Sequence, residues 1–305
     1  MDDFHENRKP VLILGFNRPE KIRLILQAVH EYGPSALYYA VDGARSEAEE
    51  ELVGAVRAVV DEFAWECSVH RLFSKTNLGS RYAVQRAVSA FFSRESDGLI
   101  LEDDCLPAPD FFRFCEIGLD RYKNDSSVGM IAGTNFLGKF ANREWDALFS
   151  DGHIWGWATW ADRWEGQSVL VGDSARSASN LRKYYGVGWP YRRRLIDRYR
   201  QGKLDAWDIP WLASLAKRGM WCLIPTRNLV TNIGHGIGGT HTTGASQFAD
   251  IEAYELPENI QLPSEVAPTR AYQRTYALRL RGEALLHRAR RPLVSGVRRM
   301  VGKFK

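Results

Sequence analysis

The chain has 305 residues, 45% of them hydrophobic and 26% charged, which is typical of a globular protein of one large domain or two. Its purely apolar runs are only a few residues long, which argues against a membrane-spanning segment. The net charge of +4 is uneven: residues 1–269 carry 30 basic and 36 acidic side chains, whereas residues 270–305 carry 11 basic and one acidic. The acidic body argues against a nucleic-acid partner, because it would repel a phosphate backbone.

The first hundred residues alternate strand and helix patterns. Short apolar runs predict strands over residues 11–16, 37–41, 68–73 and 98–101. Apolar residues at helical spacing predict three intervening helices, the second opened by a capping box of Ser46 and Glu49. The residues expected to face the core are Ile22, Ile25, Leu26 and Val29, then Leu52, Val53, Val56, Val60 and Phe63, then Ala83, Val84, Ala87, Val88 and Phe91. This order predicts an α/β fold with a doubly wound, mostly parallel sheet.

A helix after Asp110 and a strand over 128–132 are expected next, and beyond this strand the regular alternation fades. Helices over 192–199 and 209–218 are predicted in the remaining part. Nine of the ten tryptophans lie between Trp145 and Trp221, and a Gly/Thr/His loop over 232–244 closes this half. We therefore divide the chain into residues 8–135, residues 136–265 and a tail over 266–305.

The end of the tail has an amphipathic pattern. Apolar residues after Pro292 share one helical face, with basic residues opposite; they are Leu293, Val297, Met300, Val301 and Phe304, against Arg298, Arg299 and Lys303. This pattern is typical of a helix on an anionic membrane surface. A basic, partly disordered terminus is the alternative.

The cysteines and the first residues indicate the compartment. Four cysteines, Cys67, Cys105, Cys115 and Cys222, have neither CxxC pairing nor zinc-ligand spacing, so reduced thiols are expected. Residues 1–6 are acidic and lack the apolar run of a secretory signal. We expect a cytoplasmic protein that is peripheral to the inner face of the membrane.

Three consecutive carboxylates, Glu102, Asp103 and Asp104, follow the fourth predicted strand. Open α/β sheets bind ligands at the carboxyl ends of their strands, and clustered like charges need a cation. Oxygen ligands of high charge suit Mg²⁺ or Mn²⁺. The alternative is an acidic turn before a proline-containing loop.

These pieces together resemble a known family over residues 10–245. The matching segments, in order, are Val11-Leu12-Ile13-Leu14-Gly15-Phe16-Asn17-Arg18-Pro19, Val41-Asp42-Gly43, Asn77-Leu78-Gly79, Leu101-Glu102-Asp103-Asp104, Pro109-Asp110-Phe111-Phe112, Gly156-Trp157-Ala158-Thr159-Trp160, Trp207-Asp208-Ile209-Pro210-Trp211 and Gly239-Thr240-His241-Thr242. The chain resembles GT-A fold glycosyltransferases, of the inverting family 2 type, and is similar to the N-acetylglucosaminyltransferase I group. The resemblance implies a Rossmann-like GT-A domain whose first half, 8–135, binds a nucleotide-sugar donor and whose second half, 136–265, binds the acceptor.

The resemblance also implies a set of donor-binding residues. They are Phe16, Asn17, Arg18, Asp42, Asn77, Arg81 and Asp103. Asp42 would face the base or ribose and Asp103 the ribose, while Asn77 and Arg81 would meet phosphate at a helix start. The alternatives are an Asp-Gly turn for Asp42, and N-capping by Asn77 beside a solvated Arg81.

Metal and base roles follow from the same resemblance, whereas the acceptor candidates rest only on the ability of aromatic rings to stack on sugar faces. Asp104 would be the metal ligand, with Glu102 outside it, and His241 would complete the coordination, with His235 as its rival. Asp208 would be the general base, with Asp205 in reserve; its alternative is a helix cap. Trp157, Trp160 and Trp211 are candidates for acceptor contact, although most tryptophans of this half are expected in the core.

The sequence therefore predicts an inverting, metal-dependent glycosyltransferase that uses Mn²⁺ or Mg²⁺. Its donor would be a UDP-, GDP- or dTDP-sugar and its acceptor a glycan or lipid-linked glycan of bacterial surface polysaccharide. A sugar nucleotidyltransferase is the first alternative, but the chain has Gly15-Phe16-Asn17-Arg18-Pro19 in place of that class's Gly-rich basic signature. A non-catalytic carbohydrate-binding protein, the second, would leave the acidic cluster unexplained.

Overall fold

The computed structural model describes residues 8–142, 144–165, 175–234, 248 and 251–281. Its first part contains β1 (Val11–Gly15), α1 (Pro19–Tyr32), β2 (Ala36–Val41), α2 (Glu47–Val59), η1 (Val60–Glu62), β3 (Ser68–Phe73), α3 (Gly79–Phe92), β4 (Asp97–Glu102), β5 (Cys105–Pro107) and α4 (Pro109–Tyr122). The rest contains β6 (Val128–Ala132), β7 (Ala147–Ser150), β8 (Trp157–Trp160), α5 (Ala161–Glu165), α6 (Ala175–Tyr185), η2 (Gly186–Gly188), α7 (Trp189–Arg200), α8 (Asp208–Arg218), β9 (Trp221–Pro225), β10 (Val230–Asn232) and a helical stretch over 270–281.

One mixed sheet runs through the molecule. Within the described residues it has eight strands in the order β3-β2-β1-β4-β8-β6-β9-β7, and β5 pairs with β10 in a second, two-stranded sheet. The strands β3, β2, β1 and β4 are mutually parallel, β8 is antiparallel to both its neighbours, and β9 is again parallel to β6. The predicted α/β, doubly wound architecture is confirmed.

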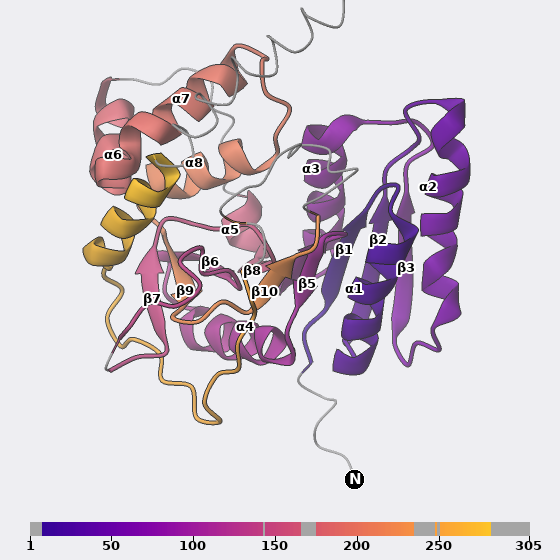
Figure 1. Cartoon of the computed structure of the whole chain (residues 1–305), viewed down its shortest axis with the longest axis horizontal. Helices are drawn as coiled ribbons and strands as arrows, with labels where there is room; N and C mark the ends of the chain where they lie inside the picture. The colour runs from indigo at the N-terminus through magenta and orange to yellow at the C-terminus, as the bar shows by residue number, and fades with distance from the viewer. Residues whose placement is uncertain (1–7, 143, 166–174, 235–247, 249–250, 282–305) are drawn as a thin grey trace, which may run out of the picture.

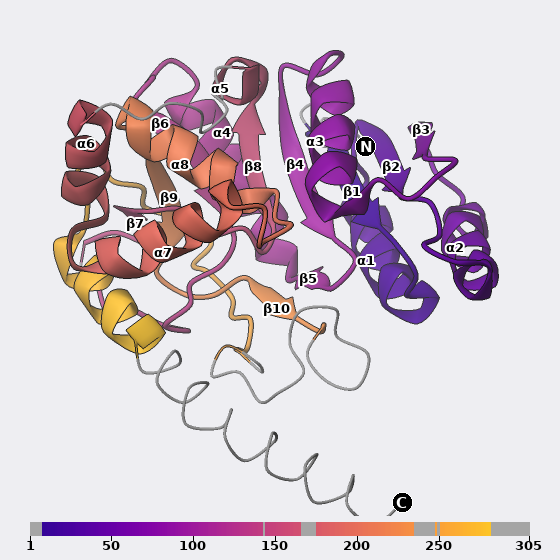
Figure 2. The same cartoon turned by 90° about the horizontal axis from the view of Figure 1, so that it is seen from above.

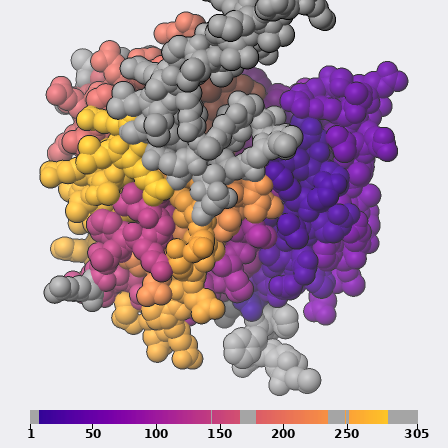
Figure 3. Space-filling view, viewed as in Figure 1, coloured from indigo at the N-terminus to yellow at the C-terminus, as the bar shows by residue number. Residues whose placement is uncertain are grey.

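Helices cover both faces of the sheet (Figures 1 and 2). Alternate residues of β1 enter different cores, as the period of a strand requires. Val11 and Ile13 pack with α1, α2 and α4, whereas Leu12 and Leu14 belong to the core that contains α3, Trp164 and α8. In the space-filling view the indigo and violet N-terminal part occupies one side of the molecule and the pink to yellow part the other (Figure 3).

Two details of α2 differ from the sequence prediction. Ser46 is the N-cap but its side chain makes no capping hydrogen bond. The Glu49 carboxylate instead accepts the backbone N–H of Arg45 at 3.1 Å and pairs with the Arg45 guanidinium. The capping-box prediction is therefore wrong, because a stronger charged partner takes Glu49. Leu52 is 43% exposed instead of buried, while Val53, Val56 and Val60 are in the core.

The remaining structural expectations can be compared directly. All four cysteines lie in the described part of the chain and are free thiols, as predicted. In the described ranges no helix is both long and apolar enough to cross a membrane. The amphipathic segment after Pro292 lies outside the described residues.

Helix α7 is joined to the sheet by a buried ion pair. Arg192 Nη2 donates to Asp151 Oδ2 at 2.9 Å, and the two side chains are only 13% and 9% exposed. Burial, the largest single cause, would raise the pKa of Asp151, but the Arg192 charge, the nearby His153 and the hydrogen bonds from Arg192 and Ser150 together hold the pKa below its usual value. Nearby, burial lowers the pKa of His153 to about 3, and its Nε2 lies 3.0 Å from the Tyr272 hydroxyl. The carboxylate thus depends on one guanidinium for its charge balance.

The variant Arg192→Met leaves Asp151 buried without its cation. We expect it to lower the free energy of unfolding by about 3–5 kcal/mol, measured by urea denaturation. The matched control is Arg194→Met, which removes an exposed arginine of the same helix and should change stability by less than about 0.5 kcal/mol. Equal losses in the two variants would contradict the assigned role of the ion pair.

Candidate functional site

A pocket opens at the carboxyl edge of the parallel strands. The chain runs from β1 outward to β2 and β3 and then returns to place β4 on the other side of β1, so the strand order reverses between β1 and β4. Such a reversal is where open α/β sheets bind ligands. The cavity measures about 400 Å³ and is lined by Leu14, Gly15, Phe16, Asn17, Arg18, Asp42, Arg45, Asn77, Gly79, Ser80, Ala83, Val84, Glu102, Asp103, Asp104 and Asp205.

The pocket carries a strong excess of negative charge. Five carboxylates line it, against the guanidinium groups of Arg18 and Arg45. Arg18 Nη1 lies 3.4 Å from Asp103 Oδ1 and 3.3 Å from Asp104 Oδ2. Burial, followed by the charge of Asp104, raises the pKa of Asp103 to about 7 despite Arg18, and the same causes raise the pKa of Glu102. One arginine does not neutralise the cluster, so a further cation would be electrostatically favourable here.

Asp42 holds a neighbouring loop in place. Its carboxylate accepts the backbone N–H of Leu78 at 3.0 Å, that of Gly79 at 3.1 Å and the Asn77 side-chain amide at 3.0 Å. Asn77 also donates to the Gly43 carbonyl at 2.8 Å, and a Cβ on Gly43 would collide with the Thr76 backbone. Both oxygens of Asp42 are therefore engaged by the protein, which favours a positioning role over contact with a base.

The start of α3 is capped by carboxylates from two other elements. Asp42 takes the first N–H groups, and Asp205 Oδ1 accepts the backbone N–H of Arg81 at 3.3 Å. The Arg81 guanidinium lies over the Tyr199 ring at 4.6 Å and does not line the pocket. The expectation that Asn77 and Arg81 bind phosphate here is not supported, because protein carboxylates already occupy this helix start.

The candidate base reaches the same cluster from the second half of the chain. Asp208 is the first residue of α8, and the N-cap is Trp207, so the alternative reading of Asp208 as the cap is not what the structure has. The charge of Asp208 contributes to the raised pKa of Glu102, which also accepts a hydrogen bond from the Trp207 side chain. Asp208 is therefore near enough to Glu102 for their charges to interact, but it is not among the residues that line the pocket.

The tryptophans chosen for acceptor contact are core residues. Trp157 and Trp211 are fully buried, and Trp160 is 4% exposed. Trp157 stacks on Trp207 with ring centroids 5.5 Å apart and packs against Trp211 at 5.8 Å. The acceptor-contact prediction is corrected for all three, because a sugar has no access to their rings.

The pocket's donor set fits a divalent cation bound together with a substrate. Its candidate ligands are carboxylate oxygens, which are the hard donors that Mg²⁺ and Mn²⁺ prefer. Among the described residues, no group of three or more His, Cys, Asp or Glu side chains is arranged so that it could hold a metal ion by itself. Mg²⁺ usually takes one or two carboxylates and fills its remaining positions with water and phosphate oxygens. His241 and His235 lie outside the described residues.

Three residues of the site were missed from sequence. Arg45 lies over the Phe16 ring at 5.0 Å and lines the pocket. Asn232 Nδ2 donates to Asp104 Oδ1 at 3.4 Å, and a Cβ on Gly234 would collide with the Asp104 carboxylate. The sequence offered one indication of the last two: Asn232 and Gly234 lie at the start of the Gly/Thr/His loop. The loop indicated this segment but not these particular residues.

No protein-family profile matches the sequence, nor does any curated protein sequence. Among solved structures, apo UDP-glucose pyrophosphorylase is similar at 10% identity and a TM-score of 0.41, over 74% of this chain and 93% of that one. The galactosyltransferase LgtC, in complex with donor and acceptor sugar analogs, is similar at 12% identity and a TM-score of 0.34, over 70% and 72%. HddC from Yersinia pseudotuberculosis gives 8% identity and a TM-score of 0.31, over 50% and 77%. The likeness concerns the α/β fold alone.

The variant Asp42→Ala removes the acceptor for the backbone N–H groups of Leu78 and Gly79. We expect it to destabilise the loop by about 1–2 kcal/mol, because partly buried N–H donors lose their acceptor. Hydrogen exchange should show faster exchange confined to residues 76–81. Asp61→Ala, at a carboxylate that is 61% exposed, is the control and should leave this segment unchanged. Unaltered protection in Asp42→Ala would refute the positioning role.

Proposed function

We propose that the chain is a metal-dependent, inverting glycosyltransferase that moves a sugar from a nucleoside diphosphate sugar to a hydroxyl group of a glycan acceptor. The observation that carries the proposal is the acidic cluster Glu102-Asp103-Asp104 in a pocket at the strand-order reversal, where the charge of Asp208 also acts on Glu102. A diphosphate in this pocket meets an excess of carboxylates. The arrangement thus suits an anionic ligand only together with a cation.

Asp104 and water would hold that cation, with phosphate oxygens of the donor completing its shell. A divalent ion there would supply Lewis-acid stabilisation of the departing diphosphate. Arg18, which lies within 3.4 Å of both Asp103 and Asp104, would orient these carboxylates and screen them from each other. Phe16, Asn17 and Asp103 would contact the nucleoside.

Asp208 would act as the general base. Its carboxylate would accept the proton of the acceptor hydroxyl as that oxygen forms a bond to the anomeric carbon of the donor sugar. The bond between that carbon and the diphosphate oxygen breaks at the same time, and its electron pair leaves with the nucleoside diphosphate. Attack from the face opposite the leaving group inverts the anomeric centre.

The wider setting of the reaction belongs to the same proposal. The resemblance to GT-A fold glycosyltransferases suggests a glycan or lipid-linked glycan of bacterial surface polysaccharide as the acceptor, at the cytoplasmic face of the membrane. The strongly basic residues 270–305 support contact with anionic lipid. Loss of vesicle binding on deletion of residues 293–305 would test this part separately.

Donor binding can be tested without any turnover. Calorimetric titration with UDP, GDP and dTDP, with and without Mn²⁺, should give metal-dependent binding of one nucleotide. Asp104→Asn should weaken it about tenfold or more, because the ion loses its protein ligand. Asp120→Asn, at a carboxylate that is 63% exposed, serves as control and should bind like the wild type. Absence of binding by every nucleotide would overturn the proposed function, and turnover of a nucleoside triphosphate with a sugar phosphate would point to a nucleotidyltransferase.

The base assignment has its own test. Asp208→Asn should keep metal-dependent nucleotide affinity within about twofold while sugar transfer falls by about 100-fold or more, because only the proton acceptor is lost. Transfer is measured with the nucleotide sugar identified by calorimetry. Asp205→Asn is the matched comparison, since Asp205 lines the pocket and is the second candidate for the base. Normal transfer by Asp208→Asn together with inactive Asp205→Asn would move the base to Asp205.

A further inference from the structure

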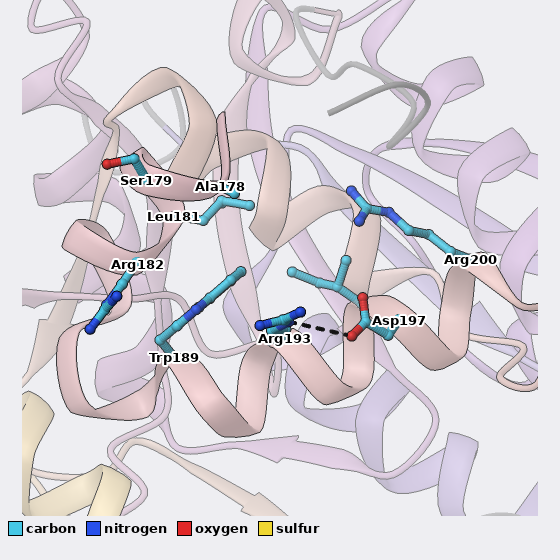
Figure 4. Close-up of a pocket in the computed structure, with 9 residues that line it drawn as sticks. Ala178, Ser179, Leu181, Arg182, Trp189, Arg193, Asp197 and Arg200 are labelled. Atoms are coloured by element: carbon cyan, nitrogen blue, oxygen red, sulfur yellow. Dashed lines mark ion pairs between the residues drawn. The ribbon is translucent and has the colours of Figure 1, made fainter. Parts of the chain in front are cut away.

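A second cavity lies between α6 and α7 and shares no lining residue with the acidic pocket (Figure 4). It measures about 470 Å³ and is lined by Ala178, Ser179, Leu181, Arg182, Trp189, Arg193, Ile196, Asp197 and Arg200. The α7 members recur at positions i, i+4, i+7, i+8 and i+11, which places them on one side of the helix, facing α6. We call this cavity the α6–α7 groove.

The groove combines an apolar floor with a charged rim. Leu181 and Ile196 are buried, and the indole of Trp189 is half-buried between the helices. Figure 4 shows the Trp189 ring directed toward Leu181 and Ala178, with Arg193 and Asp197 paired beside it. An accessible aromatic ring next to hydrogen-bonding charged groups is the composition that suits a sugar, which has an apolar face and polar edges.

The rim is strongly basic. Residues 178–200 contain seven basic side chains and one acidic, and Arg182, Arg193 and Arg200 all line the groove. Arg193 Nε lies 3.6 Å from Asp197 Oδ2, but these side chains are 67% and 46% exposed, so this pair is weak. Guanidinium groups bind carboxylate and phosphate in a bidentate manner, so the groove selects an anionic ligand.

One end of the groove approaches the acidic pocket. Arg200, the last residue of α7, lines the groove, and Asp205, five residues later, lines the pocket. The contact of the Arg81 guanidinium with the Tyr199 ring at 4.6 Å holds this end of α7 against the start of α3. The twelve residues of α7 span about 18 Å, so a chain-like ligand lying along the helix would point toward the proposed reaction centre.

We propose that the α6–α7 groove binds an acidic saccharide segment of the acceptor, one that carries carboxylate or phosphate groups. Trp189 packs against the apolar face of a sugar ring, and Arg182, Arg193 and Arg200 bind the acidic groups. Asp197 accepts hydrogen bonds from sugar hydroxyls. The identity of this ligand as an acceptor rests on the proposed function, whereas binding of an acidic saccharide in the groove does not.

The test uses the full-length chain and a galacturonic acid hexamer, with neutral maltohexaose and inorganic phosphate as comparison ligands, by calorimetry. The acidic hexamer should bind at least about tenfold more tightly than either comparison ligand, since it alone offers both charge and ring faces. The double variant Arg182→Gln/Arg193→Gln should weaken that binding about tenfold or more. The matched control is Arg194→Gln/Arg198→Gln, which removes the same charge from exposed positions of the same region outside the groove.

The outcomes separate the two proposals. If the groove variant loses the acidic hexamer but keeps metal-dependent nucleotide affinity, the inference is supported. If the wild type binds the hexamer at the groove but binds no nucleotide, the inference about the groove stands and the proposed function is wrong. Equal losses of hexamer affinity in the groove and control variants would mean that binding depends only on overall positive charge, and would overturn the inference. The inference would also be overturned if the groove variant lost only its binding to vesicles of anionic phospholipid, since a membrane surface would then be the ligand.

Discussion

The concentration of negative charge at the end of β4 is the constraint around which the elements that form the candidate site are arranged. Glu102, Asp103 and Asp104 lie at the carboxyl end of β4, where the strand order reverses between β4 and β1, and their mutual repulsion is relieved only in part by Arg18. The segment around Asn232 and Gly234 closes directly on Asp104, and the start of α8 closes on Glu102. Elements from both halves of the chain thus converge on charges that they do not neutralise.

The sequence predicted the fold well where one physical signal dominated. The apolar periods of α1 and α3 and the strands β1 to β4 were found because a helix that buries one face and a strand that buries both faces each impose a strict apolar pattern. The sequence prediction failed where tertiary partners competed. The Glu49 carboxylate binds Arg45 instead of forming a capping box with Ser46, and the oxygens of Asp42 accept the backbone N–H groups of Leu78 and Gly79. Residues such as Asn232 reach the site through pairing of β10 with β5, a contact 125 residues apart in sequence that no local pattern encodes.

Charge is divided between two neighbouring hollows. The pocket at the sheet edge is lined by five carboxylates and two arginines, and the groove between α6 and α7 by three arginines and one carboxylate. An anionic ligand is therefore attracted by the groove and repelled by the pocket, unless a cation accompanies it into the pocket. The buried pair of Asp151 and Arg192 fixes α7 to the sheet and so keeps this separation of charge in a constant geometry.

The Asp42–Gly43 step has a consequence for how such a chain can change over evolutionary time. Asp42 ties down the loop from Thr76 to Gly79, and the same closeness leaves no space for a side chain at position 43. Replacement of Asp42 alone removes the hydrogen bonds that hold the loop, and replacement of Gly43 alone forces the loop outward. The two positions are therefore coupled, and a descendant protein would keep the pair intact or rebuild the whole loop with it.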